Sequence, residues 1–189
     1  MSESGIIVIS APSGAGKGTL VARILPFYPE LALTVSATTR PPRTGEENGR
    51  EYYFLSRQDF EAGIEKGAFA EWAEVHGNLY GTFKTEIDRL LLKGRHVLLE
   101  LDVQGMLSMK AQYPALTSIF IVPPDMEVLK ERLTRRGTDD AAVVAVRLQT
   151  AAREMERQQE FDYVLVNDDL DVATEALKNL VDSILNSHR

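Results

Sequence analysis

The stretch Ala11-Pro-Ser-Gly-Ala-Gly-Lys-Gly-Thr19 decides the fold of this chain. It follows a run of strand-forming residues at 6–9 and precedes a periodic apolar segment at 20–25. A strand, a glycine-rich turn, a lysine and a helix in this order are typical of a loop that binds nucleotide phosphates. The glycines let successive backbone N–H groups point at an anion, and the helix N-terminus and Lys17 add positive charge. The alternative is an ordinary tight turn, but such turns rarely combine three glycines with a lysine.

Two positions of this loop depart from the pattern G-x-x-x-x-G-K-[ST]. Ala11 replaces the first glycine, which is tolerable where the backbone φ is negative. Gly18 replaces the residue whose hydroxyl binds Mg²⁺, and the hydroxyl of Thr19 is turned roughly 100° away on a helix. We therefore expect a metal to depend on waters and carboxylates, which suits Mg²⁺.

The composition limits the possible classes of protein. A chain of 189 residues with 44% hydrophobic content predicts one compact domain, and a net charge of −7 argues against a protein that coats nucleic acid. The absence of cysteine excludes disulfides and thiolate chemistry, and the three histidines are too scattered to form a metal site. The N-terminus is not a signal peptide and the apolar runs are too short to span a bilayer, so we expect a soluble cytoplasmic protein.

Strand and helix patterns alternate along most of the chain. Strand-like runs are expected at 6–10, 96–101, 118–122 and 163–166, and helices at 17–25, 84–93, 106–112, 125–134, 140–159 and about 173–184. Continuous apolar strands that alternate with helices predict an α/β fold with a parallel sheet covered on both faces.

Residues 36–83 break this alternation. They contain the run Tyr52-Tyr53-Phe54-Leu55, a helix at 57–66 and a strand-like run at 69–75, followed by a Gly-Asn turn. Ser56 and Asp59 resemble a capping box at the start of that helix, and Gly67 fits its end. We interpret this region as a small β-rich lobe inserted into the sheet protein, placed to close over a ligand.

Several motifs together resemble the guanylate kinase family, in order and with matching spacing over nearly the whole chain. They are Ser13-Gly-Ala-Gly-Lys-Gly-Thr19, Ser36-Ala-Thr-Thr-Arg-Pro-Pro-Arg-Thr-Gly-Glu46, Gly77-Asn-Leu-Tyr-Gly81, Asp102-Val-Gln-Gly105, Arg132-x-x-x-Arg136-Gly137 and Val166-Asn-Asp-Asp169. The resemblance implies transfer of the γ-phosphate of ATP to GMP, with Mg²⁺. It also implies a P-loop nucleoside monophosphate kinase fold in one domain, with a core (1–35, 84–133 and 149–189), a GMP-binding lobe (36–83) and a helical lid (134–148).

The resemblance also assigns roles on the ATP side. Lys17 would bridge the β- and γ-phosphates, and Arg132, Arg136 and Arg147 match the lid and catalytic arginines. Asn167 matches a contact to adenine. The remaining ATP-binding positions are the loop residues Ser13, Gly14, Ala15, Gly16, Gly18 and Thr19, with Arg136 as a further ATP contact. Taken singly, each arginine would instead be read as part of a solvated helix face.

On the GMP side, the resemblance assigns two groups of residues. The GMP phosphate would be held by Arg40 and Arg43 with hydroxyls from Tyr52 and Tyr80, and Glu46 belongs to the same segment. Guanine would be recognised by Glu71, Ser36 and Thr82, because a carboxylate accepts from both N1–H and N2–H of guanine. Asp102 would contact the nucleotide or the water shell of Mg²⁺. Glu100, where the family commonly has aspartate, is not carried over.

Two other interpretations remain open on the sequence. A kinase-shaped module could bind phosphopeptides through Arg40, Arg43 and Tyr52, although the intact Gly16-Lys17 pair argues against this. A kinase for another acceptor such as AMP is the second, and Glu71 with Ser36 and Thr82 argues against it. ATP and GMP are the expected partners, with neither nucleic acid nor membrane among them, and the sequence does not indicate an oligomeric state.

Overall fold

The centre of the molecule is a five-stranded parallel sheet with the strand order β2-β7-β1-β8-β9. The computed structural model describes residues 5–75, 77–135 and 141–187. The strands are β1 (Ile6–Ser10), β2 (Leu31–Leu33), β7 (His96–Leu101), β8 (Thr117–Val122) and β9 (Tyr163–Val166). All their pairings are parallel, as the sequence predicts.

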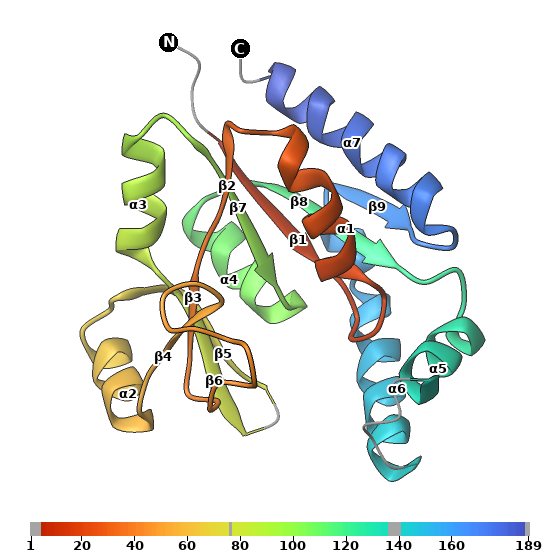
Figure 1. Ribbon diagram of the computed structural model, residues 1–189, viewed down its shortest axis with the longest axis horizontal. Coiled ribbons are helices and arrows are strands. Elements are labelled where there is room, and N and C mark those ends of the chain that lie inside the picture. The colour runs from red at the N-terminus through yellow and green to blue at the C-terminus, as the bar shows by residue number, and fades with distance from the viewer. Residues whose placement is uncertain (1–4, 76, 136–140, 188–189) are drawn as a thin grey trace.

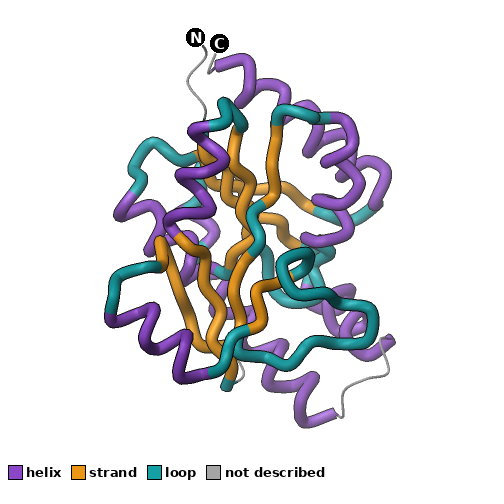
Figure 2. Tube along the Cα trace, turned by 60° about the vertical axis from the view of Figure 1, so that its left-hand side comes forward, coloured by secondary structure: helices purple, strands orange, loops and turns teal. Residues whose placement is uncertain are grey.

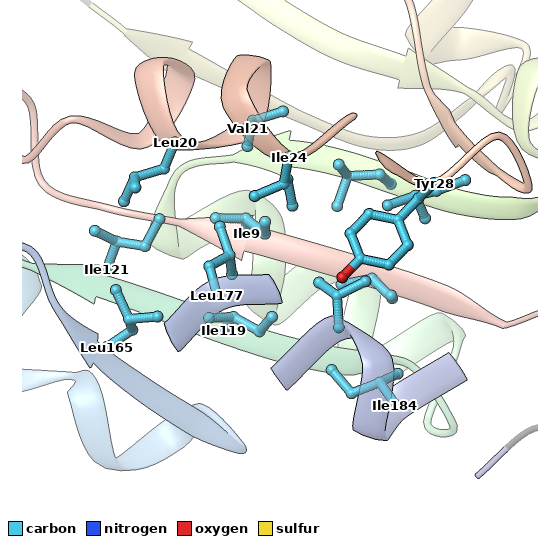
Figure 3. Close-up of a cluster of buried hydrophobic side chains, with 14 of the residues drawn as sticks. Ile9, Leu20, Val21, Ile24, Tyr28, Ile119, Ile121, Leu165, Leu177 and Ile184 are labelled. Atoms are coloured by element: carbon cyan, nitrogen blue, oxygen red, sulfur yellow. The ribbon is translucent and has the colours of Figure 1, made fainter. Parts of the chain in front are cut away.

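Helices cover both faces of this sheet, which confirms the expected α/β class (Figure 1). Ile7 and Ile9 of β1 pack toward α1 (Lys17–Ile24) and α7 (Leu170–Ser187), together with the side chains drawn in Figure 3. Ile6 and Val8 point to the other face, into the cluster that includes Ile87 of α3 (Lys84–Leu92) and Met106 of α4 (Val103–Gln112). Alternate burial on two covered faces explains why β1 is apolar from Ile6 to Ile9.

Residues 36–83 form a second sheet with the strand order β4-β3-β6-β5. Its strands are β3 (Ser36–Thr38), β4 (Tyr52–Phe54), β5 (Phe69–Val75) and β6 (Asn78–Phe83), and α2 (Arg57–Glu65) packs against them. The rings of Phe60, Phe69 and Phe83 stack with centroids 4.3 and 4.6 Å apart. The region is β-rich, as expected. Figure 2 shows the strands of this lobe in the lower half of the view, below those of the central sheet.

Two helices flank the sheet on the side away from this lobe (Figure 1). They are α5 (Met126–Arg135) and α6 (Ala141–Glu156), followed by the short 3-10 helix η2 (Gln158–Glu160); the 3-10 helix η1 (Leu25–Phe27) continues α1. Leu129 and Leu133 of α5 pack against Val144 and Ala151 of α6 in a small separate core. Nowhere in the described ranges is a helix both long and apolar enough to cross a membrane.

Two helices begin earlier than the hydrophobic periodicity predicts, and caps explain both differences. The Asp102 carboxylate accepts from the backbone N–H of Gly105 at 2.6 Å, so α4 begins at Val103 rather than near residue 106. The Asp169 carboxylate accepts from the N–H groups of Asp171 and Val172, so α7 begins at Leu170. At α2, the predicted Ser56 cap is confirmed by a 3.0 Å bond from Asp59 N.

Candidate active site

The predicted phosphate-binding loop lies between β1 and α1. Gly14 and Gly16 have φ angles of +93° and +94°, a left-handed conformation that favours glycine. A Cβ on Gly16 would lie 2.4 Å from Nδ2 of Asn167, so this position also lacks room for a side chain. The first turn of α1 contains no acidic residue of its own, so the positive end of the helix dipole is available to an anion bound at the loop.

Lys17, the first residue of α1, turns back toward the end of β7. Its Nζ donates to the backbone carbonyl of Leu101 at 3.0 Å. Desolvation lowers the pKa of the Lys17 ammonium, and the carboxylates that oppose this shift are Glu100, Asp102, Glu154 and Glu71, with Glu100 the largest contributor. Lys17 is therefore enclosed by acidic side chains from several elements.

A cavity of about 1130 Å³ opens beside the loop. The expected ATP-binding residues Ser13, Gly14, Gly16, Lys17, Gly18 and Thr19 all line it. Ala15 does not line it; the residue is buried and its carbonyl faces Asn167. The lining also includes Arg147, Thr150 and Glu154 of α6, and Arg157, which directly follows this helix. The volume is large enough for a nucleotide.

A second cavity of about 240 Å³ lies between the two sheets. Its walls come from the β-rich lobe, with Ser36, Tyr52, Glu71 and Tyr80, and from the core, with Lys17, Glu100 and Asp102. Lys17 and Asp102 line both cavities. Two molecules bound in the two cavities would therefore meet beside the lysine and this carboxylate.

The polar groups of the small cavity gather around Glu71. Desolvation, with a smaller contribution from Asp102, raises the pKa of the Glu71 carboxyl to about 7. Ser36 Oγ and Thr82 Oγ1 lie 3.4 Å apart, and Thr82 also hydrogen-bonds Glu71. A Cβ on Gly105 would lie 2.9 Å from Glu71 Oε2, so the glycine lets α4 approach the carboxyl. The structure thus brings together all the residues predicted to recognise guanine, with Ser36 and Glu71 in the cavity lining and Thr82 buried behind it.

The predicted phosphate-binding arginines lie beside this cavity and are absent from its lining. Arg40 Nη2 is 2.9 Å from Glu46 Oε1, and its guanidinium carbon lies 5.5 Å from the centre of the Tyr52 ring. The second oxygen of Glu46 accepts from the backbone N–H of Arg43 at 2.7 Å. Glu46 therefore positions the two-arginine segment, and its pKa is lowered mainly by the bond to Arg40.

Only some of the other residues expected to bind ATP line the large cavity. Arg147 lines the large cavity, whereas Arg132 donates to the backbone carbonyls of Asn167 and Asp168 at 2.9 and 3.1 Å. Arg136 lies outside the described residues. Asn167 is buried, and its Nδ2 donates to Ala15 O at 2.7 Å, so its amide supports the phosphate-binding loop.

Two acidic residues near Lys17 were not predicted as site residues. Glu154 lines the large cavity, and desolvation, followed by Asp102, raises the pKa of its carboxyl to about 7. Glu100 lines the small cavity. The spacing of Arg147, Thr150, Glu154 and Arg157 puts them on one face of a helix, a pattern in the sequence that could have revealed Glu154. Glu100 stands where the family commonly has aspartate, but it was not carried over as a site residue.

The parallel sheet, the phosphate-binding loop and the paired cavities define a P-loop nucleoside monophosphate kinase. The family model described as guanylate kinase matches residues 3–184. This chain belongs to the guanylate kinase family.

Individual relatives agree with this assignment. The guanylate kinase of Desulfitobacterium hafniense (strain Y51) is 47% identical over 176 residues, covering 93% of this chain and 88% of the relative. That of Dechloromonas aromatica (strain RCB) is 49% identical, covering 93% and 87%. The crystal structure of guanylate kinase from Anaplasma phagocytophilum superposes with a TM-score of 0.77 at 32% identity, covering 98% of this chain and 88% of the other.

Proposed function

We propose that this chain transfers the γ-phosphate of ATP to GMP, giving ADP and GDP. The observation that carries the proposal is the pair of adjoining cavities with Lys17 and Asp102 in the wall of both. Curated relatives that match more than nine-tenths of this chain carry the name guanylate kinase. The alternative of a phosphopeptide-binding module does not account for the large cavity against the phosphate-binding loop.

In this proposal ATP occupies the large cavity, with its phosphates against residues 13–19. The backbone N–H groups of the loop and the N-terminus of α1 stabilise the phosphate oxygens, and Lys17 moves from Leu101 O to the β- and γ-phosphates. Arg132, Arg136 and Arg147 are proposed to stabilise the charge that spreads over the transferred group. Asn167 is proposed to contact adenine as well as to support the loop.

GMP occupies the small cavity. Ionised Glu71 accepts from N1–H and N2–H of guanine, with Ser36 and Thr82 as neighbouring hydroxyls and Asp102 beside them. Tyr52 and Tyr80 line the same cavity, and Arg40 and Arg43, positioned by Glu46, bind the phosphate. AMP lacks this pair of donors, so it would leave the buried carboxylate unpaired.

We propose Mg²⁺ as the divalent metal that kinases of this family need. The described residues contain no group of three or more acidic, histidine or cysteine side chains that could hold a metal without help. A carboxylate at the junction of the cavities, Asp102, together with nucleotide phosphates and waters, is a donor set that suits Mg²⁺. When bound, the cation would neutralise phosphate charge during transfer.

The domain organisation proposed above follows from the same assignment: a core (1–35, 84–133 and 149–189), a GMP-binding lobe (36–83) and a lid (134–148). We propose the cytoplasm as the place of action, since ATP and GMP are the substrates and the chain has no cysteine that needs an oxidising compartment. The net charge of −7 does not favour nucleic acid as a partner.

A coupled assay of ADP formation tests the activity. With MgATP as donor, GMP is expected to be the preferred acceptor, with dGMP the next and AMP, UMP and TMP far slower. Preference for AMP over GMP would contradict the guanine assignment.

Lys17→Met tests the phosphate-binding loop. We expect turnover to fall by at least about 10²–10³-fold, because one donor to a developing anion has that effect. Circular dichroism should show an unchanged fold. Lys93→Met, at an exposed position after α3, is the matched control and should keep full activity.

A further inference from the structure

Glu100 carries a buried oxygen that the fold does not satisfy. It is the residue before the last in β7 and pairs in register with Ile9 of the central strand. Its Oε1 is shielded from solvent and has no hydrogen-bond partner among the described residues. A carboxylate oxygen without a donor or a cation is costly in this position, so such an atom calls for an explanation.

Gly18 of the phosphate-binding loop lies beside this carboxylate. A Cβ at this position would lie 3.7 Å from Oε1 of Glu100, which is ordinary van der Waals contact. Position 18 is the one where the phosphate-binding pattern has a serine or threonine, whose hydroxyl is a ligand of Mg²⁺. The carboxylate of Glu100 therefore lies beside the place that the missing hydroxyl would occupy.

The charges around Glu100 also favour a cation. Lys17 lies among Glu100, Asp102, Glu154 and Glu71, and of these four Glu100 has the largest electrostatic effect on the ammonium. Burial, with smaller contributions from Tyr80 and Glu100, raises the pKa of the Tyr52 phenol, which lines the small cavity. A carboxylate close to the phosphates of a bound nucleotide would repel them unless a divalent cation lies between them.

We propose that Glu100 supplies, to the coordination sphere of the magnesium ion of bound MgATP, the oxygen that a hydroxyl at position 18 supplies in other phosphate-binding loops. Gly18 and Glu100 form a compensating pair: the glycine leaves the space, and the carboxylate provides the ligand. The inference rests on the proposed function, because it takes MgATP as the bound donor.

The test measures Mn²⁺ binding in place of turnover. The probe is Mn²⁺ added to the protein saturated with an ATP analogue whose γ-phosphate cannot be transferred, with free Mn²⁺ followed by electron paramagnetic resonance. Glu100→Gln is expected to weaken Mn²⁺ binding by about tenfold or more, the effect typical of losing a group from a metal's surroundings. Glu65→Gln, at an exposed position on α2 that lines neither cavity, changes the charge equally and should leave Mn²⁺ binding unchanged.

The double variant Gly18→Ser with Glu100→Gln tests the compensation. Serine fits at position 18 without a short contact, and its hydroxyl should restore Mn²⁺ affinity to within about threefold of the original. An E100Q protein that binds Mn²⁺ as tightly as the unchanged chain would overturn the proposal. A double variant that stays as weak as E100Q would contradict the shared position of the two oxygens.

A second measurement separates metal binding from an effect through Lys17. In the presence of a chelator, the affinity of E100Q for the analogue should be equal to or higher than that of the unchanged chain, because one negative charge near the phosphates has gone. An equal loss with and without metal would assign Glu100 to the support of Lys17 and overturn the proposal. Failure of the unchanged chain to make GDP would contradict the proposed function alone, since Mn²⁺ binding needs no acceptor.

Discussion

Glu71 lies on β5 with 6% of its surface exposed, and burial raises the pKa of its carboxyl to about 7. The carboxyl is therefore partly protonated at neutral pH, whereas the guanine recognition that we propose for Glu71 needs the ionised form. GMP binding should release a proton below pH 7, so GMP affinity should fall by up to about tenfold for each pH unit below 7. Titration calorimetry in buffers of different ionisation enthalpy measures the released proton.

Glu71→Gln serves as the comparison for this prediction, because the GMP phosphate also titrates in this range. The variant should bind GMP about 10–100-fold more weakly, since an amide presents a mismatched donor in a closed pocket. Its pH dependence should be that of the nucleotide alone, and its affinity for an ATP analogue should be unchanged. Equal losses for both nucleotides would contradict a role of Glu71 in guanine recognition.

The same carboxyl should affect folding stability. Because its pKa is higher in the folded state, the folded protein binds the extra proton, and the unfolding free energy falls as pH rises from about 4.5 to about 7. Above pH 7 the loss is complete, on the order of 3 kcal/mol at most. Urea unfolding should therefore show that Glu71→Gln gains stability relative to the unchanged chain between pH 5 and pH 8.

At the scale of elements, the phosphate-binding loop depends on a side chain from the opposite end of the chain. Asn167, after β9, donates to Ala15 O at 2.7 Å and fills the space beside Gly16. Asn167→Ala should leave a buried carbonyl without its donor and lower the unfolding free energy by about 1–3 kcal/mol. Affinity for an ATP analogue should fall as well, and calorimetry can measure both. Asn186→Ala, on the exposed side of α7, is the control.

The elements that sequence patterns predicted well are those whose signals are local. β1, β7 and α1 combine apolar runs or periodicity with clear boundaries, and the structure places them within a residue or two of the prediction. The strands Leu31–Leu33, Ser36–Thr38 and Asn78–Phe83 were not predicted, because they are short or hold their place by pairing with distant strands.

The phosphate-binding loop was predictable because one local motif contains all its residues. The group of Ser36, Glu71 and Thr82, whose members are far apart in the sequence, was named only by the family resemblance, and the structure brings the three together. The acidic side chains around Lys17 could not be predicted in this way. Glu100 and Glu154 come from β7 and α6, which folding alone brings to the same lysine. No sequence motif shows that Asn167 supports the phosphate-binding loop either, because its hydrogen bond to Ala15 O joins residues 152 positions apart.

At the scale of the whole molecule, the small cavity draws its walls from both sheets. A ligand that contacts Glu71 and Tyr80 on one side and Lys17 on the other would pull the lobe toward the core. Small-angle scattering should show the radius of gyration, about 16 Å for a chain of this length, decreasing by about 1 Å when GMP is added. An unchanged radius with saturating GMP would mean that the lobe is already closed.

The wall shared by the two cavities has a consequence for inhibitor design. A single compound with guanosine at one end, adenosine at the other and a linear oligophosphate between them would thread past Lys17 and fill both compartments at once. Its second end would bind at an effective concentration in the millimolar range, set by the tether rather than by the solution. Such a bivalent compound should outcompete either mononucleoside ligand by orders of magnitude.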